Sequence, residues 1–147
     1  MRFHLTDLKI YEDGKVDCWE LMSFEKFKEK VMSGWVRTTV PDGSTVSIFP
    51  LGNFVVWNTD LHVKETELIK HVKDIIRELQ GKPTSSDICR KIFEEYNKKP
   101  SDKNKERLRK AYENIPEHNR VYVLHDMDNK DYPIKRIIYN TKTNSGR

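Results

Sequence analysis

Ionisable side chains gather in one segment of the chain, residues 116–133, around a short apolar stretch. The segment holds two histidines, four carboxylates and one arginine. Imidazole and carboxylate groups act as general acids and bases and as ligands of divalent metals. This segment is therefore the first place to look for chemistry. The candidate binding residues are Glu117, His118, Arg120, His125, Asp126, Asp128 and Asp131.

The spacing of these groups departs from known metal motifs. Residues 126–131 resemble the start of a calcium loop, but Lys130 takes the fifth position and Asp131 takes the sixth, where the loop needs glycine. His125 and Asp126 form a His-Asp dipeptide, which would need further ligands converging on it. Two interpretations stay open: a metal-assisted hydrolase that draws its ligands from residues 118–131, and an acidic turn whose carboxylates cap backbone amides.

Other catalytic chemistry finds little support in the sequence. Cys18 falls in an expected strand and Cys89 beside the apolar positions of an expected helix, so both are expected to be buried thiols rather than nucleophiles. The glycines are dispersed and form no phosphate-binding loop. No catalytic residue, metal site or cofactor is predicted.

The formal charge of +4 is unevenly distributed along the chain. Up to Val63 there are 7 Lys or Arg against 9 Asp or Glu, and beyond it 20 against 14, so the two parts carry −2 and +6. A basic helical part can attract nucleic acid, which is one alternative function. Acidic residues alternate with the basic ones, however, and Tyr96 and Tyr112 fit a core better than a stacking platform. The pattern therefore favours a solvated helix surface.

The expected elements divide into strands first and helices later. Residues 3–11 and 15–21 form a hairpin around Gly14, and residues 35–40 and 44–49 form a second one around 41–43. A buried fifth strand covers residues 54–57. Helices begin after Ser23, after Val63 with apolar residues three and four apart over 68–79, after 84–86 and at 100–102. Residues 134–139 suggest a last strand.

These elements predict an α+β fold. About five antiparallel strands in the N-terminal half would pack against helices, and the C-terminal half would be mainly helical with a possible last strand. A length of 147 residues suits a single domain, placed at residues 1–140, followed by a polar tail at 141–147. The open edge of the last strand makes a homodimer possible.

Several segments, taken in order, resemble a family of small uncharacterised bacterial proteins. They are Ser23-Phe-Glu-Lys-Phe27, Ser33-Gly-Trp-Val36, Pro41-Asp-Gly43, Gly81-Lys-Pro-Thr-Ser-Ser86 and the segment 116–131. The resemblance covers about residues 19–134. It implies a bacterial cytosolic protein and brings no established activity, so no functional residue is transferred.

Two functions from different classes are carried forward. The first is a non-enzymatic protein-binding domain, of the immunity or antitoxin kind, in which the charged segment forms ion pairs or a polar contact surface. The second is the metal-assisted hydrolase, with nucleic-acid binding as a further alternative. Two isolated cysteines, no apolar N-terminal run and no membrane-length apolar stretch indicate a cytoplasmic protein without membrane contacts.

Overall fold

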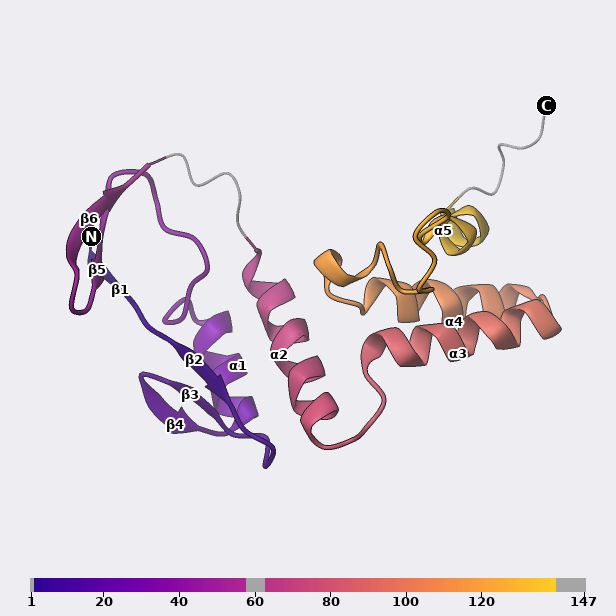
Figure 1. The fold of residues 1–147 in the computed structure, drawn as a ribbon, viewed down its shortest axis with the longest axis horizontal. Coiled ribbons are helices and arrows are strands. Elements are labelled where there is room, and N and C mark those ends of the chain that lie inside the picture. Colours follow the sequence, from indigo (N-terminus) through magenta and orange to yellow (C-terminus); the bar gives the residue numbers. More distant parts are fainter. Residues whose placement is uncertain (1, 58–62, 140–147) are drawn as a thin grey trace. The chain divides into compact units, whose positions relative to one another are not determined.

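The computed structural model describes residues 2–57 and 63–139. Its fold is α+β, with five α-helices and two three-stranded sheets among the described residues (Figure 1). The prediction of one five-stranded sheet is therefore wrong, while the order of strands first and helices later is confirmed. The strands are β1 (Arg2–Leu5), β2 (Leu8–Ile10), β3 (Val16–Cys18), β4 (Glu20–Met22), β5 (Ser44–Ile48) and β6 (Gly52–Val56); the helices are α1 (Phe24–Met32), α2 (Glu65–Leu79), α3 (Ser85–Lys98), α4 (Asp102–Glu113), the 3-10 turn η1 (Glu117–Asn119) and α5 (Tyr132–Tyr139).

The chain divides into two compact units, Met1–Gln80 and Gly81–Arg147. Each unit has its own apolar core, built from its own elements. The single domain expected over residues 1–140 stays a prediction, because compactness does not measure whether the units unfold together. The tail at 141–147 lies outside the described residues.

The core of the first unit lies between a small sheet and two helices. The sheet has the order β2-β3-β4, and its first pair is the predicted hairpin, with Gly14 at a φ of 90°. Ser23 caps α1 by accepting a hydrogen bond from the Lys26 amide, as predicted. Val16, Phe27 and Val72 are fully buried where β3, α1 and α2 meet.

The second sheet has the order β1-β5-β6, with β1 parallel to β5 and β5 antiparallel to β6. The hairpin predicted around 41–43 is wrong, because residues 35–40 form no strand. Side-chain hydrogen bonds, instead of strand pairing, hold residues 37–39. The Glu65 carboxylate accepts bonds from the Thr38 amide and the Thr39 hydroxyl, and Arg37 Nε donates to the Thr39 carbonyl. The turn at 41–43 instead leads directly into β5.

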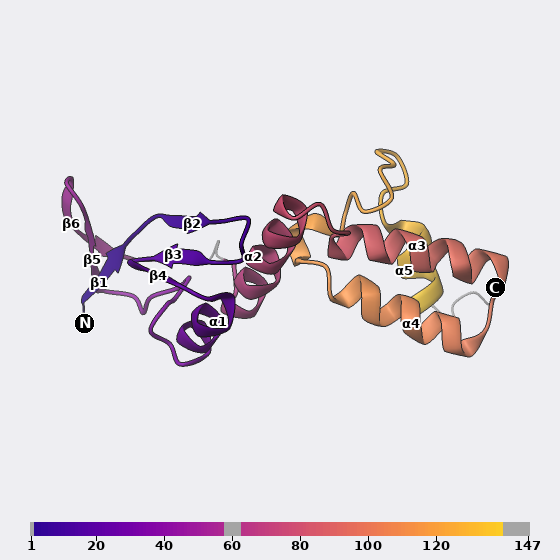
Figure 2. The same ribbon diagram turned by 90° about the horizontal axis from the view of Figure 1, so that it is seen from below.

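The described residues of the second unit form helices and turns, and no strand. Figure 2 shows α3 and α4 side by side, with α5 beside them. Thr84 and Asp87 form a capping box at α3, and the Ser101 hydroxyl caps α4. None of the described helices is long and apolar enough to cross a membrane.

The predicted last strand, residues 134–139, is wrong: this segment is the helix α5. Its apolar residues fit both periods, since Ile134 and Ile138 are four apart and Ile137 is adjacent. In the helix, Ile134 and Ile138 lie on one face and are buried in the second core. Packing of that face onto α4 decides the structure, and the strand edge proposed for a homodimer does not exist.

Candidate functional site

Three of the seven predicted candidate residues, Arg120, Asp126 and Asp131, hold the polypeptide in place. Arg120 donates from Nε to the Ile115 carbonyl at 3.0 Å and from Nη2 to the Glu113 carbonyl at 2.9 Å. These bonds satisfy carbonyls at and just beyond the C-terminus of α4, where helical partners run out. Its guanidinium also lies 5.5 Å from the Tyr112 ring centre. The charge of Arg120 is therefore used inside the fold.

Asp126 forms a local turn instead of a metal ligand set. Its carboxylate accepts bonds from the Asp128 amide at 2.8 Å, the Asn129 amide at 3.0 Å and the Asn129 side-chain amide at 3.0 Å. These bonds, those of Asn129 first, lower the pKa of Asp126. The interpretation of an acidic turn that caps amides is confirmed for this residue.

Asp131 points inward. It is buried, and its carboxylate accepts a hydrogen bond from the Tyr112 hydroxyl. Glu117 and His118 lie on the exposed turn η1, and His125 and Asp128 are exposed in the following loop. His125 takes a left-handed φ of 61°.

The pool of ligands expected for a metal-assisted hydrolase does not converge. Asp126 faces its own turn, Asp131 faces Tyr112, and Asp128 is exposed. Across residues 2–57 and 63–139, no group of three or more His, Cys, Asp or Glu is arranged to hold a metal ion. A hydrolytic metal centre needs at least three such ligands around one open position, so the geometry does not support that function. His62 lies outside the described residues.

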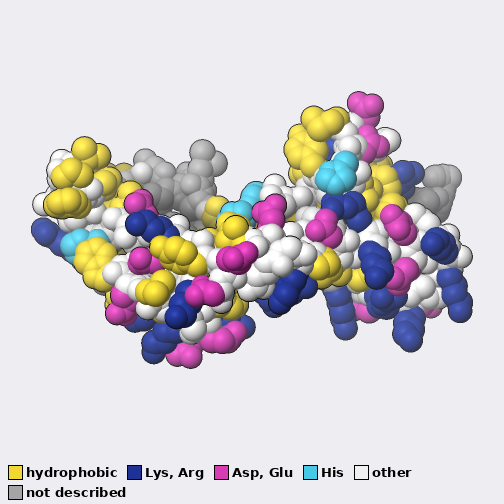
Figure 3. Space-filling view, turned by 60° about the horizontal axis from the view of Figure 1, so that its bottom comes forward, with side chains coloured by type: hydrophobic (Ala, Val, Ile, Leu, Met, Phe, Trp, Pro, Cys, Tyr) yellow, Lys and Arg dark blue, Asp and Glu magenta, His cyan; other side chains and the backbone are white. Residues whose placement is uncertain are grey.

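Some basic side chains of the second unit are paired with acidic neighbours. Arg107 bonds Glu95 at 2.8 Å across α3 and α4, while Arg109 pairs with Glu106 and Glu113. Figure 3 shows basic and acidic side chains interspersed on the second unit. Tyr112 is buried and Tyr96 packs against the same core, as predicted. Neither of these two tyrosines therefore forms an exposed platform of the kind typical of single-strand binding.

Both cysteines are buried free thiols, as predicted. Burial raises the pKa of Cys89 to about 11 and also raises that of Cys18. A thiol with a raised pKa holds little of the nucleophilic thiolate at neutral pH. Neither cysteine is a candidate nucleophile.

A surface that the sequence did not single out lies on the β1-β5-β6 sheet. Strand alternation and register place Phe3, Val46 and Phe54 side by side as an apolar row on one face of the sheet. Leu5 and Ile48 are paired on the same face on one side of this row, and Val56 lies on its other side. We call these six residues the apolar sheet face. Leu5 is 61% exposed, Phe54 is also exposed, and the other four are half-buried.

The apolar sheet face belongs to neither core of the described residues. A face with regular alternation is normally the side of a sheet that packs on something. Here the guanidinium of Arg37, 5.5 Å from the Phe3 ring centre, covers part of it. Figure 3 shows apolar side chains gathered over this sheet.

Trp19 stands between this sheet and the β2-β3-β4 sheet. It is the single residue between β3 and β4, its φ is 73°, and it is 65% exposed. A bulky side chain in the left-handed region is strained, and such strain concentrates at functional sites. Its ring centre lies 5.6 Å from that of His4 on β1. The backbone thus holds a large aromatic ring on the surface.

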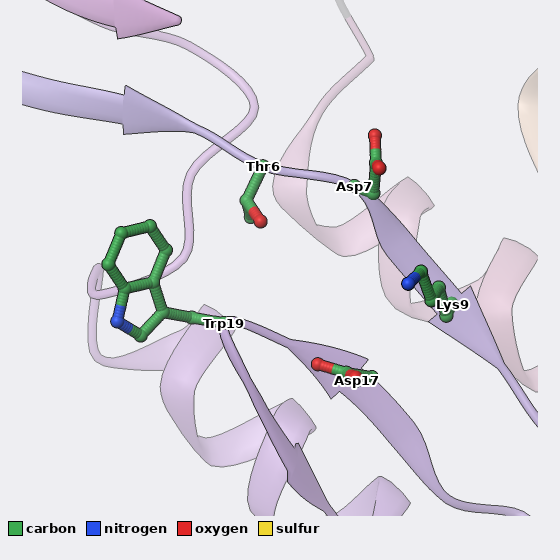
Figure 4. Close-up of a pocket in the computed structure, with 5 residues that line it drawn as sticks. All are labelled: Thr6, Asp7, Lys9, Asp17 and Trp19. Carbon is green, nitrogen blue, oxygen red and sulfur yellow. The ribbon is translucent and has the colours of Figure 1, made fainter. Parts of the chain in front are cut away.

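Trp19 lines two hollows of different character. The first, about 350 Å³, is polar and is drawn in Figure 4, where Lys9 and Asp17 come from neighbouring strands. Its lining also includes Asp7, so two carboxylates stand against one lysine and the hollow carries a net negative charge. The second hollow, about 460 Å³, is mainly apolar and includes Leu5, Ile48, Phe49 and Pro50 with Trp19. We call it the apolar groove.

Sequence reasoning missed this site because it took the strand at 54–57 as buried on both faces. Phe54, Val55 and Trp57 are exposed. The available signal was the stretch 43–59, which contains no charged residue in a chain that is 34% charged. An uncharged stretch in such a chain indicates either a core or an interface.

The boundary between the two units is matched by the comparison with protein families. One family model, described as Domain of unknown function (DUF7638), matches residues 1–83. The chain belongs to this family. A second model, Domain of unknown function (DUF7639), matches residues 84–146. No curated protein and no solved structure matches the chain.

Proposed function

We propose that the protein is a non-enzymatic binding domain whose first unit holds another protein on the apolar sheet face. The supporting observation is that this face is regular and apolar, yet belongs to neither core. Burying one large aliphatic or aromatic side chain stabilises by about 1.5–3 kcal/mol. Leu5 and Phe54 leave much of that free energy available to a partner.

The chemistry of the surface defines the partner. The apolar groove is lined by Leu5, Ile48, Phe49 and Pro50, with the Trp19 ring along one side. Tryptophan held at a rim beside an apolar hollow is a common binding hot spot. The partner should therefore insert a large aliphatic or aromatic side chain, with its remaining contacts spread over the apolar sheet face.

The biological setting is part of the same proposal. A small protein that neutralises a toxin or another effector by occupying it, as immunity proteins and antitoxins do, needs such a surface and no catalytic group. We place it in the bacterial cytosol, where reducing conditions keep thiols free. The two buried, unpaired cysteines support that setting.

The test uses a random peptide library displayed on phage and panned against the full chain. Selected peptides should be rich in Phe, Leu, Ile and Trp. Leu5→Glu places a charge in the apolar groove and should weaken a selected fluorescent peptide by tenfold or more, about 1.4 kcal/mol. Fluorescence anisotropy measures the dissociation constant.

A matched control separates binding from charge. Thr45→Glu adds the same charge to the same sheet, on the face opposite the apolar one, and should bind the peptide as the wild type does. Circular dichroism checks that both variants keep their fold. Peptides that bind equally well to Leu5→Glu, or a library that yields no apolar sequences, would contradict the proposal.

A further inference from the structure

The strand β6 is an unprotected edge. Among the described residues it pairs on one side only, with β5. Natural edge strands usually carry charges, prolines or bulges that prevent pairing with other chains. β6 has no charge and no proline, and neither does its continuation through Trp57.

The outward side of β6 offers backbone groups for pairing. The Val56 carbonyl accepts a bond from the Gly43 amide at 2.8 Å, so Val56 directs its backbone groups toward β5. Because these groups alternate along a strand, the N–H and C=O of Asn53 and Val55 point away from β5. The Val55 side chain is 58% exposed. A neighbouring strand would meet both free backbone groups and apolar side chains.

We propose that β6 pairs antiparallel with β6 of a second copy of this chain, giving a two-fold homodimer. Two-fold pairing brings the same strand against itself, and no like charges oppose it because residues 43–59 carry none. The β1-β5-β6 sheets of the two chains would then join into one six-stranded sheet. This inference goes beyond the proposed function, since it uses the strand edge and leaves the apolar sheet face to another partner.

The other edge of the sheet explains why pairing stops at two copies. β1 carries Arg2 and His4, and the Arg37 guanidinium lies beside Phe3 of the same strand. These groups protect an edge in the usual way. In the dimer, both outer strands would be β1, so the six-stranded sheet has no second unprotected edge.

The first experiment removes one outward amide. Val55→Pro deletes an N–H that faces away from β5, a position where an edge strand tolerates proline. Val55→Thr keeps the amide, the size and the β-branched shape, and is the matched control. Light scattering after size-exclusion chromatography should give twice the 17.5 kDa chain mass for wild type and Val55→Thr. The dissociation constant of the Val55→Pro dimer should be about tenfold higher than that of wild type, or more.

The second experiment does not depend on proline being tolerated. Val55→Cys would lie close to its equivalent across the two-fold axis, and a short bismaleimide linker should join the two chains. Thr45→Cys lies one strand further in, on β5, and should be joined far less. The native cysteines are buried and do not compete.

Several outcomes would overturn the homodimer. A wild type that stays monomeric at every concentration would leave the edge to a strand of a different protein. A dimer that both Val55→Pro and Val55→Cys show to be independent of β6 would place the contact elsewhere. Assemblies larger than two chains would show that β1 does not close the sheet. None of these results affects peptide binding by the apolar sheet face.

Discussion

Tyr112 and Tyr139 make the same chemical contact in different surroundings. Each hydroxyl donates to a carboxylate: Tyr112 to Asp131, and Tyr139 to Glu113 at 2.6 Å. Tyr112 is only 4% exposed, whereas Tyr139 is 50% exposed. Burial raises the pKa of Tyr139 to about 12 and that of Tyr112 further still. Both tyrosines therefore remain protonated donors at neutral pH.

Removing the buried hydroxyl should cost stability. Tyr112→Phe leaves the buried Asp131 carboxylate without this donor, and an unsatisfied buried polar group costs about 1–3 kcal/mol. Tyr139→Phe removes a hydroxyl that water replaces, so its cost should stay below about 0.5 kcal/mol. Urea denaturation monitored by circular dichroism gives both values. Equal losses in the two variants would show that burial of the Tyr112–Asp131 pair is not what stabilises the second unit.

The roles of single residues were predictable only where the contact is local. Asp126 bonds amides two and three residues away, and the sequence correctly suggested such a turn. Asp131 bonds a tyrosine 19 residues earlier. That contact requires α4 and α5 to be packed together first. A cluster of ionisable residues in a sequence therefore locates charge, but it does not show which charges are used within the fold.

The same distinction holds for helices and strands. Caps at Ser23, Thr84 and Ser101 lie within three residues of the amides they bind, and the helices start where predicted. The sheet β1-β5-β6 instead joins Arg2 to Thr45. No short-range pattern encodes that partner. The β5–β6 hairpin is local, with Ile48 opposite Gly52, and was missed because the turn at 41–43 was taken to join two strands. Long-range strand pairing is the part that the sequence alone did not reveal.

Glu65 is the side chain that fixes the segment before β5 to the start of α2. Burial raises its pKa, but bonds from the Thr38 amide, from its own amide and from the Thr39 hydroxyl outweigh burial and lower the pKa from 4.5 to about 2. A carboxyl whose pKa is lower in the folded state stabilises the fold above its unfolded pKa. That stabilisation is lost as the pH falls from about 4.5 toward 2.

Glu65→Gln should therefore change how stability depends on pH. At neutral pH the variant should lose about 1 kcal/mol, because hydrogen bonds to a charged acceptor become bonds to a neutral one. The difference from wild type should shrink as the pH falls through the window just given. Urea denaturation between pH 2 and pH 7 measures it.

A control on the same helix isolates the contribution of these hydrogen bonds. Glu78→Gln makes the same change of charge at an exposed position of α2, and surface changes of this kind stay within about 0.5 kcal/mol. If Glu65→Gln were as stable as wild type at neutral pH, or if its deficit were unchanged near pH 2, the carboxylate would not hold the segment to α2.

At the scale of the whole chain, two independent divisions nearly coincide. The compact units meet between Gln80 and Gly81, and the two family models meet between residues 83 and 84. The short connection contains Gly81 and Pro83, neither of which continues a helix readily. The proposed binding surfaces both lie in the first unit. If each core folds by itself, a change in the stability of the second unit leaves these two binding surfaces unaltered.

Unfolding one core selectively tests that condition in the intact chain. Leu108 is fully buried in the second core and Phe27 in the first, and truncating either to alanine should cost about 2–5 kcal/mol. Since no core residue is shared, Leu108→Ala should speed hydrogen exchange only in residues after 81, and Phe27→Ala only in those before. Mass spectrometry of peptic fragments reports each unit separately. Faster exchange throughout the chain in both variants would instead establish the single cooperative domain that the sequence predicts, because destabilising either core would then open the other.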